Sequence, residues 1–324
     1  MSDPTPYSPT DTTLASEVRF TAESFRPRQQ GRRSLSRRVK AFMEPRLIYA
    51  RGHVPPPRVL PDFIIIGARK GGTTFLYNNL VRQRGFLPAY KKEVQFFDKF
   101  YGNGPAWYRA HFPTTVAMGA LGLMRGRPAI TGESTPLYLF HPKAPERVQA
   151  LMPQARLIVL LRNPVDRAYS HYEHQARRNV GAKSFEEALE SEAIFQRGQA
   201  AQELRLLMTR DDYISEPRQV LSYLSGGVYV DQLRGWYQRF RPERILVIQS
   251  EEMYRDTMPV LERVTEFLGG EPQSVKIARE NRKRGYPKMN PDTRKRLEDY
   301  FAPHNARLYR FLAERGVAFT PWEQ

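Results

Sequence analysis

The feature that most constrains this chain is a glycine-rich loop set between an apolar run and a helical pattern. Residues 63–66 are apolar and largely β-branched, as in a strand buried within a parallel sheet. Gly71 and Gly72 follow, and their backbone freedom lets amide groups approach an anion closely. The pattern becomes helical from Thr73, so the loop leads into a helix N-terminus, which favours negative charge. The sequence therefore predicts a phosphate-binding loop in an α/β fold.

This loop differs at one position from the loop of nucleoside triphosphatases. Gly67 and Gly72 keep the spacing of G-x-x-x-x-G-K-[ST], and Thr74 holds the Ser/Thr position. Thr73 stands where those enzymes have their lysine, and the lysine of this loop is Lys70 instead. The arrangement suits a 5′-phosphosulfate better than the β,γ-phosphates of a Mg-bound nucleotide. A P-loop nucleotide kinase remains the alternative from a different class.

A second motif follows another apolar run, at residues 157–161. Arg162 comes directly after this predicted strand, at the end where ligands of open α/β sheets bind. Pro164 then starts a helix at a position that tolerates a missing N–H, and Ser170 lies further along that helix. A guanidinium and a hydroxyl form a reasonable receptor for a phosphate monoester. Alternatively, Arg162 only caps the strand and Ser170 is an ordinary helix residue.

Together the two motifs resemble those of sulfotransferases that use 3′-phosphoadenosine 5′-phosphosulfate (PAPS) and release adenosine 3′,5′-bisphosphate (PAP). Residues 70–74 resemble the 5′-phosphosulfate loop, and the segment from Arg162 to Ser170 is similar to the 3′-phosphate motif R-(N/D)-P-x-x-R-x-x-S. The resemblance implies that Lys70 is catalytic, by neutralising the leaving oxygen, and that no metal is required. It also implies a donor site formed by Arg69, Lys70, Gly71, Gly72, Thr73, Thr74, Arg162 and Ser170.

The segment between these motifs resembles one branch of that family, the N- and 3-O-sulfotransferases of heparan sulfate. Lys92-Glu-Val-Gln-Phe-Phe-Asp98 matches a motif in which the glutamate is the catalytic base, and Glu93 holds that position. A carboxylate there could remove the acceptor proton, although Glu93 could also simply pair with Lys91 or Lys92. Ser134 departs from the branch, which usually has a lysine near the substrate. We therefore expect a glycan or amino-sugar acceptor, with a phenolic or other small natural product as the alternative.

The C-terminal part resembles the same family. Tyr229 lies in a segment that matches a late family helix, and the resemblance makes it an adenine-side contact. A basic K/R-G loop of the family closes over the 3′-phosphate, and its counterpart here consists of Arg282, Lys283, Arg284 and Gly285. The motifs span residues 60–324, and the Arg-, Pro- and Ala-rich composition is typical of a bacterial member.

The alternation of apolar runs and helical patterns predicts a three-layer, P-loop-like α/β fold. A central parallel sheet of about five strands would be flanked by helices on both faces. Residues 1–57 are Ser/Thr/Pro-rich and then Arg-rich, and we expect a disordered or extended basic segment followed by a sulfotransferase domain over residues 58–324. The predicted strands are residues 63–66, 87–90, 129–132, 157–161 and 245–248. The predicted helices are residues 73–82, 165–178, 185–199, 229–240, 259–267 and 291–314.

Composition narrows the class of partner. A formal net charge of +17 indicates an acidic partner, such as a bisphosphate, an anionic glycan, a membrane surface or a nucleic acid. The aromatic residues lie within apolar patterns rather than between basic ones, which disfavours nucleic-acid binding. The chain has no cysteine, and its six histidines show no metal-ligand spacing, so we expect no metal site. Since no apolar stretch reaches signal-peptide or membrane-spanning length, we expect a cytoplasmic protein without a transmembrane segment.

Overall fold

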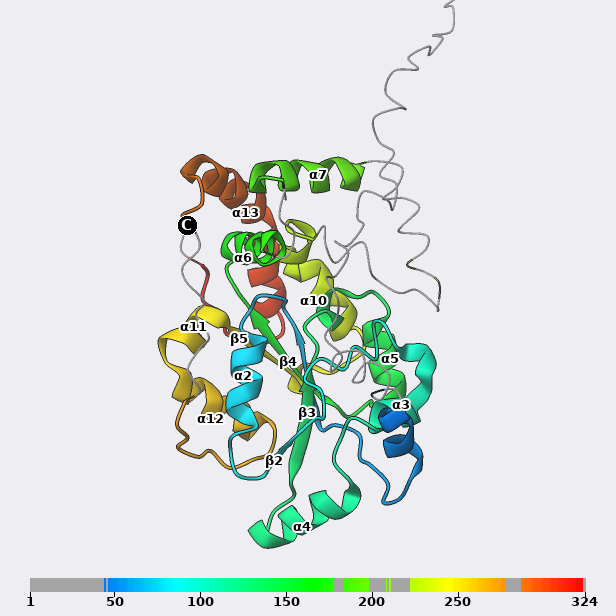
Figure 1. The fold of residues 1–324 in the computed structure, drawn as a ribbon. Helices are drawn as coiled ribbons and strands as arrows, with labels where there is room; N and C mark the ends of the chain where they lie inside the picture. Colours follow the sequence, from blue (N-terminus) through cyan, green and yellow to red (C-terminus); the bar gives the residue numbers. More distant parts are fainter. Residues whose placement is uncertain are drawn as a thin grey trace, which may run out of the picture. The chain divides into compact units, whose positions relative to one another are not determined.

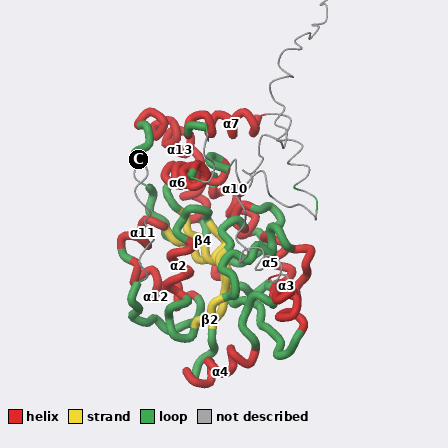
Figure 2. Tube along the Cα trace, in the orientation of Figure 1, coloured by secondary structure: helices red, strands yellow, loops and turns green. Residues whose placement is uncertain are grey.

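The centre of the molecule is a parallel sheet of five strands in the order β2-β3-β1-β4-β5. This computed structural model describes residues 44, 46–177, 183–197, 208, 210, 222–277 and 287–322. Figures 1 and 2 show the strands running through the middle of the fold, with helices on either side. The predicted α/β class and parallel sheet are confirmed. The strands are β1 (Phe63–Gly67), β2 (Phe86–Pro88), β3 (Ile130–Ser134), β4 (Arg156–Leu161) and β5 (Ile245–Gln249).

Helices bury both faces of this sheet. On one face, Leu76 of α2 (Thr73–Leu80) and Val264 of α12 (Thr257–Phe267) belong to one apolar cluster with Ile65. The opposite face packs against α5 (Ala144–Leu151), α6 (Pro164–Ala176), α10 (Tyr229–Tyr237) and α13 (Pro291–Ala313). Because side chains alternate between faces along a strand, a strand covered on both sides must be apolar throughout, as β1 is.

The helices confirm the predicted pattern, with ends that differ by a few residues, and α7 (Phe185–Arg197) is one of those predicted. Among the helices that follow β1, four were not predicted. They are α3 (Gly104–Arg109), α4 (Thr115–Arg125), α5 and α11 (Ser250–Arg255). Two of them, α3 and α11, have six residues each, which is too short for a periodic apolar pattern to show.

The N-terminal part is described only from residue 44 onward, apart from residue 45. Residues 46–53 are helical, and Ile48 is buried. The Arg51 Nε donates a hydrogen bond to the Ala110 carbonyl at 2.9 Å, and Arg58 Nη1 donates to the Phe112 carbonyl at 2.7 Å. The predicted boundary at residue 58 and the character of residues 1–57 remain predictions. Within the described ranges, no helix is long and apolar enough to cross a bilayer.

Candidate active site

Several predicted site residues follow the carboxyl ends of the strands: the glycine-rich loop follows β1, Arg162 follows β4 and Glu93 follows β2. Strand β1 lies between β3 and β4, with Ile65 opposite Ser134 on one side and Ile158 on the other. Because all three strands run parallel, their C-terminal ends open on the same edge. The chain leaves β1 toward β2 and β3 but later returns to the opposite side as β4, so this edge lies at a topological switch point, where α/β sheets bind ligands.

The loop after β1 is tightly held, and we call residues 67–72 the glycine loop. A side chain at Gly71 would place its Cβ 2.7 Å from the Leu160 carbonyl oxygen, so only glycine fits against β4. Gly72 has φ +91° and forms the N-cap of α2. The Ser250 hydroxyl donates to the Gly71 carbonyl at 2.7 Å and fixes the loop to the end of β5.

The first residues of α2 complete the anion site. The amides of the first helical turn have no intrahelical acceptor, and with the helix dipole they favour a bound anion. Thr73 is buried, whereas the side chain of Thr74 is exposed at the helix N-terminus. Lys70 adopts φ +70°, a left-handed conformation that is uncommon for a side chain other than glycine. Such conformations cluster at functional sites, where the surrounding structure holds them in place.

Arg162 connects the second motif directly to the glycine loop. Its Nη1 donates to the Lys70 carbonyl at 3.4 Å, so the guanidinium lies beside the loop. The Tyr229 hydroxyl donates to the Arg162 carbonyl at 2.8 Å. Tyr229 itself is only 1% exposed, and its ring belongs to the apolar core. Tyr229 therefore supports the backbone at Arg162, and its role as an adenine-side contact remains a prediction.

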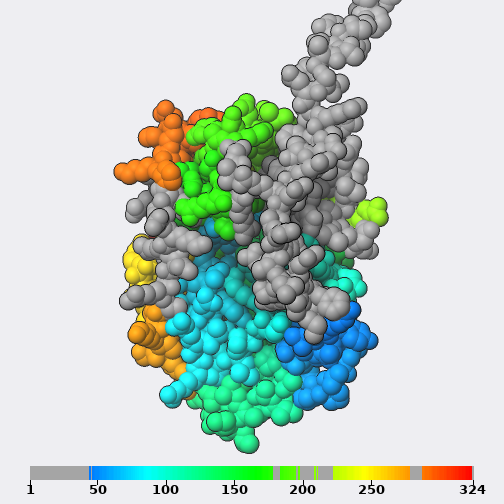
Figure 3. Space-filling model, in the orientation of Figure 1, coloured from blue at the N-terminus to red at the C-terminus, as the bar shows by residue number. Residues whose placement is uncertain are grey.

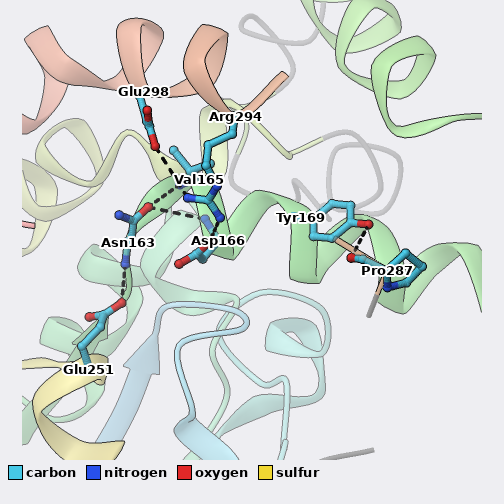
Figure 4. Close-up of polar contacts among 8 residues, drawn as sticks. All are labelled: Asn163, Val165, Asp166, Tyr169, Glu251, Pro287, Arg294 and Glu298. Carbon is cyan, nitrogen blue, oxygen red and sulfur yellow. Dashed lines mark hydrogen bonds and ion pairs between the residues drawn. The ribbon is translucent and has the colours of Figure 1, made fainter. Parts of the chain in front are cut away.

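The backbone after Arg162 is fixed by a chain of polar contacts, shown in Figure 4. The Asn163 side chain caps α6 by accepting from the Val165 amide at 3.0 Å. The Asn163 amide donates to Glu251 at 2.8 Å, and the Trp322 indole N–H donates to the other Glu251 oxygen at 3.1 Å. Trp322 thus helps to hold the backbone next to Arg162 through the Glu251 carboxylate.

The predicted basic loop, Arg282 to Gly285, lies outside the described residues. Where the chain resumes at Pro287, its carbonyl accepts a hydrogen bond from the Tyr169 hydroxyl of α6 at 2.9 Å (Figure 4). Further on, Arg294 of α13 pairs with Asp166 of α6 at 2.6 Å. Both contacts attach the segment after the basic loop to the helix that carries Ser170.

Two neighbouring residues of α6 face the interior near the glycine loop. Ser170 is 3% exposed. His171 is fully buried, and no hydrogen-bond partner for either ring nitrogen occurs among the described residues. Burial lowers the pKa of His171 well below its usual value, and the positive charges of Arg69, Arg167 and Lys70 lower this pKa further. The imidazole is therefore neutral, and the field around it is strongly positive, as an anion site requires.

On the other side of β1, residues 91–98 form what we call the Glu93 loop. The Glu93 side chain is 45% exposed and pairs with Lys92 Nζ at 2.9 Å, so the simple ion pair considered for this residue is present. Gln95 adopts φ +58°. Lys70 and Gln95 are the only non-glycine residues with positive φ within the described ranges, and each belongs to one of the two loops predicted to be catalytic.

A buried carboxylate beneath this loop was not predicted. Glu133, near the end of β3, is fully buried and accepts four hydrogen bonds. One comes from the Val94 amide at 3.3 Å, one from the Thr135 hydroxyl at 2.6 Å, and two come from the Tyr108 and Tyr138 hydroxyls at 2.8 and 3.1 Å. We call Glu133 and these three hydroxyl side chains the Glu133 hub.

The hub holds the Glu93 loop by its backbone. The Thr135 hydroxyl accepts from the Gln95 amide at 3.3 Å. The Tyr138 hydroxyl accepts from the Phe96 amide at 2.8 Å and from the Phe97 amide at 3.4 Å. With the Val94 bond, four consecutive amides after Glu93 are thus fixed by one buried polar network, which places the Glu93 carboxylate at the edge of the sheet.

Comparison with known proteins identifies the family. The model of the sulfotransferase domain matches residues 60–305. The chain is a member of the sulfotransferase family. This sulfotransferase is 29% identical over 295 residues to human bifunctional heparan sulfate N-deacetylase/N-sulfotransferase 3, covering 81% of this chain and 31% of that protein. It is 29% identical over 284 residues to human heparan sulfate glucosamine 3-O-sulfotransferase 6, covering 80% of this chain and 74% of that one.

A solved structure supports the same family assignment. The sulfotransferase resembles the crystal structure of a sulfotransferase from Alicyclobacillus acidocaldarius with a TM-score of 0.58 and 29% identity, covering 82% of this chain and all of that one. The predicted resemblance to the heparan sulfate branch is confirmed by these relatives. The chain spans about a third of the length of the bifunctional relatives, at 31% of the human protein.

Electrostatics distinguishes the carboxylates of the sulfotransferase. Burial raises the pKa of Glu133 to about 7, although the four hydrogen bonds that it accepts lower this pKa. Burial also raises the pKa of Asp98 to about 6; the amides of Asp98 and Lys99 oppose this rise, and the nearby Glu93 charge adds to it. Glu133 has no exposed surface, so it cannot reach an acceptor, whereas Glu93 can. Over the described ranges, no three His, Asp or Glu side chains are grouped so as to hold a metal ion.

Proposed function

We propose that this sulfotransferase moves a sulfuryl group from PAPS to a hydroxyl or amine of a carbohydrate acceptor, with Glu93 as the base. The observation that carries the proposal is the meeting of three elements at one sheet edge: the glycine loop, Arg162 and the Glu93 loop. The relatives named above support a glycan acceptor, since their names specify heparan sulfate. The cysteine-free composition fits a cytoplasmic site of action.

On the donor side, the chain supplies a fixed array of positive charge. The amides at the start of α2, with the hydroxyls of Thr73 and Thr74, suit the 5′-phosphosulfate. Lys70, in the glycine loop with φ +70°, would neutralise charge on the leaving oxygen, a preorganised electrostatic contribution. Arg162 and Ser170 suit the 3′-phosphate, joined by Arg69 and by the basic loop, residues 282–285.

On the acceptor side, Glu93 receives the proton. When bound, PAPS supplies a sulfuryl group attached through an oxygen that becomes a phosphate oxygen of PAP. The acceptor oxygen or nitrogen forms the new bond to sulfur, the bridging S–O bond breaks, and the acceptor proton passes to the Glu93 carboxylate. Lys92 Nζ, 2.9 Å from this carboxylate, is the cation nearest to the proposed base among the ion pairs of the described residues.

Two measurements test the proposal. In calorimetry, the protein should bind PAP far better than 5′-AMP and independently of Mg²⁺, because Arg162 and α6 form a 3′-phosphate receptor. In a mass-shift assay with PAPS and a panel of heparan-type glycans, amino sugars and phenols, the glycans or amino sugars should gain the sulfate. Equal affinity for PAP and 5′-AMP would contradict the donor assignment, and sulfation of phenols alone would contradict the acceptor.

A further inference from the structure

The helix α4 presents an apolar surface to solvent far from the candidate active site. Leu123 and Met124 are 87% and 84% exposed, the highest values among the large apolar residues of the described chain. Val116, on the same helix, is 65% exposed. No residue of α4 is buried. An amphipathic helix normally turns its large apolar side chains toward a core, as the half-buried Met118 and Leu121 do, whereas these three residues face solvent.

The helix is nevertheless firmly placed. The Thr114 hydroxyl caps its start by accepting from the Ala117 amide at 3.1 Å, and the Thr115 amide donates to the Pro57 carbonyl at 2.8 Å. Gly126, with φ +66°, ends it. The start of α4 is therefore tied to residue 57, and its end is closed by a local cap. In Figure 3 this segment forms the lower end of the view, and in Figure 1 α4 lies beyond the start of β3.

The surroundings of α4 are basic. No aspartate or glutamate occurs between Asp98 and Glu133 in the sequence. Arg125 and Arg127 follow the exposed apolar pair, and the Arg125 guanidinium lies against Gly85, as the position of a Cβ built there shows. Arg82 and Arg84, exposed beside Gly85, add two more charges. A partial counter-charge comes from Glu271, 3.9 Å from Arg127.

We propose that α4 docks the enzyme on an anionic lipid bilayer. Leu123, Met124 and Val116 would enter the interface between headgroups and acyl chains, while the neighbouring arginines contact the lipid phosphates. Apolar area and attraction to anionic lipids are the two contributions that hold a helix in this plane, and each basic residue near the surface adds to the second. At 11 residues the helix is too short to span a bilayer, so it lies on the surface.

This docking would orient the enzyme. The helix leads into the amino end of β3, whereas the glycine loop, the Glu93 loop and Arg162 lie at the carboxyl ends of the strands. A molecule held by α4 therefore directs its candidate active site away from the bilayer, toward glycans that extend from it or diffuse nearby. The inference does not depend on which acceptor is used.

The test uses the full chain with vesicles of phosphatidylcholine, with and without phosphatidylglycerol. Sedimentation should show binding only with phosphatidylglycerol, weakened by salt. The double variant Leu123→Asp, Met124→Asp should lower the partition coefficient by about tenfold or more, since it removes apolar area and adds negative charge. A matched control is Ile194→Asp, which changes a 52% exposed residue of α7 and should bind vesicles like the wild type.

Three outcomes would overturn the proposal: no preference for anionic vesicles, equal losses in the α4 variant and the Ile194 control, or an oligomer that the α4 variant dissociates while vesicle binding stays unchanged. The last would make this face a contact between copies of the chain. Calorimetric PAP affinity should be the same in all variants, which confirms that they fold.

Discussion

The two sides of the candidate site are stabilised in different ways. On the proposed acceptor side, one buried carboxylate, Glu133, holds four consecutive backbone amides: one directly and three through the hydroxyls of Thr135 and Tyr138. On the donor side, several separate cations surround the glycine loop, and a neutral buried histidine, His171, lies among them. Burial raises the pKa of the carboxylic acid and lowers that of the histidine, so both groups resist charging.

The two sides of this sheet edge therefore need different electrostatic surroundings: positive charge where an anion binds, and a single exposed carboxylate where a proton is accepted. The proposed donor side would need positive charge to hold phosphates, and burial beside Arg69 and Lys70 disfavours protonation of His171. The acceptor side must hold one exposed carboxylate at a fixed point, and it does so with a rigid network rather than with charge. Mutations on one side only can therefore test whether donor binding and proton transfer depend on separate sets of residues.

The largest expected effect is at the proposed base. Glu93→Gln is nearly isosteric and should lower kcat by about two to four orders of magnitude, the contribution of a general base, while PAP affinity stays unchanged. Single-turnover sulfation and calorimetry measure the two quantities. Glu262→Gln, at an exposed position of α12, is the matched control. If Glu93→Gln kept full activity, another residue would have to be the base, and the Glu93 loop would take no part in proton transfer.

Lys70 should give the next largest effect, on the donor side. Lys70→Ala should reduce kcat by about 10²–10³, the range seen when one preorganised charge-stabilising group is removed. Lys70→Gly provides a second arm, because it removes the same charge while accepting φ +70° without strain. The two variants should lose activity equally. A Gly variant that is active when the Ala variant is not would show that the backbone, not the ammonium group, matters.

Arg162 should affect binding more than turnover. Arg162→Ala should cost about 2–3 kcal/mol of PAP affinity, or roughly 30- to 150-fold, the value of a hydrogen bond to a charged group. Affinity for 5′-AMP, which lacks the 3′-phosphate, should barely change. A fall in the ratio of PAP affinity to 5′-AMP affinity would therefore assign Arg162 to the 3′-phosphate. Arg234→Ala, at an exposed position of α10, serves as the control.

The Glu133 hub predicts a pH dependence of stability. The pKa of Glu133 is about 7 in the folded protein and near 4.5 when unfolded, so between these values the folded state binds more protons. Its free energy of unfolding should therefore fall as pH rises from 4.5 to 7, by about 2–3 kcal/mol relative to Glu133→Gln. Urea denaturation of both proteins across this range measures the difference. Parallel curves would mean that Glu133 titrates normally and that the hub is not tightly buried.

The smallest effect is expected from the contact between Trp322 and Glu251. Trp322→Phe keeps an aromatic ring but removes the indole N–H, and it should weaken PAP binding by about 0.5–1.5 kcal/mol, the net value of one hydrogen bond. The KM for the acceptor should not change, because the contact supports Arg162 on the donor side alone. A change in the acceptor KM alone would mean that the Trp322–Glu251 contact supports the acceptor side and not the donor side.

The sequence predicted much of this arrangement, for identifiable reasons. Short apolar runs such as residues 63–66 and 157–161 are typical of strands buried in a parallel sheet. The glycine loop directly follows the first run, and Arg162 directly follows the second. The hub could not be predicted in the same way, because Tyr108 and Glu133 meet only through the fold. A signal was present in the segment Glu133-Ser-Thr-Pro-Leu-Tyr138, where three hub residues lie within six positions. Similarly, the burial of Tyr229 depends on how α10 packs, which no local pattern encodes.

The strand order also has a consequence for engineering. Everything on the acceptor side lies in one continuous stretch, from β2 to the turn that contains Tyr138, whereas the donor side is assembled from β1, β4, β5 and the C-terminal helix. Among the described strands, β2 and β3 join the rest of the sheet along β1, through the pairing of β3 with β1. We therefore expect residues 84–141 to be exchangeable as a single cassette between related enzymes. If the proposed assignment of the two sides is right, such a graft should change the acceptor and leave donor affinity unchanged.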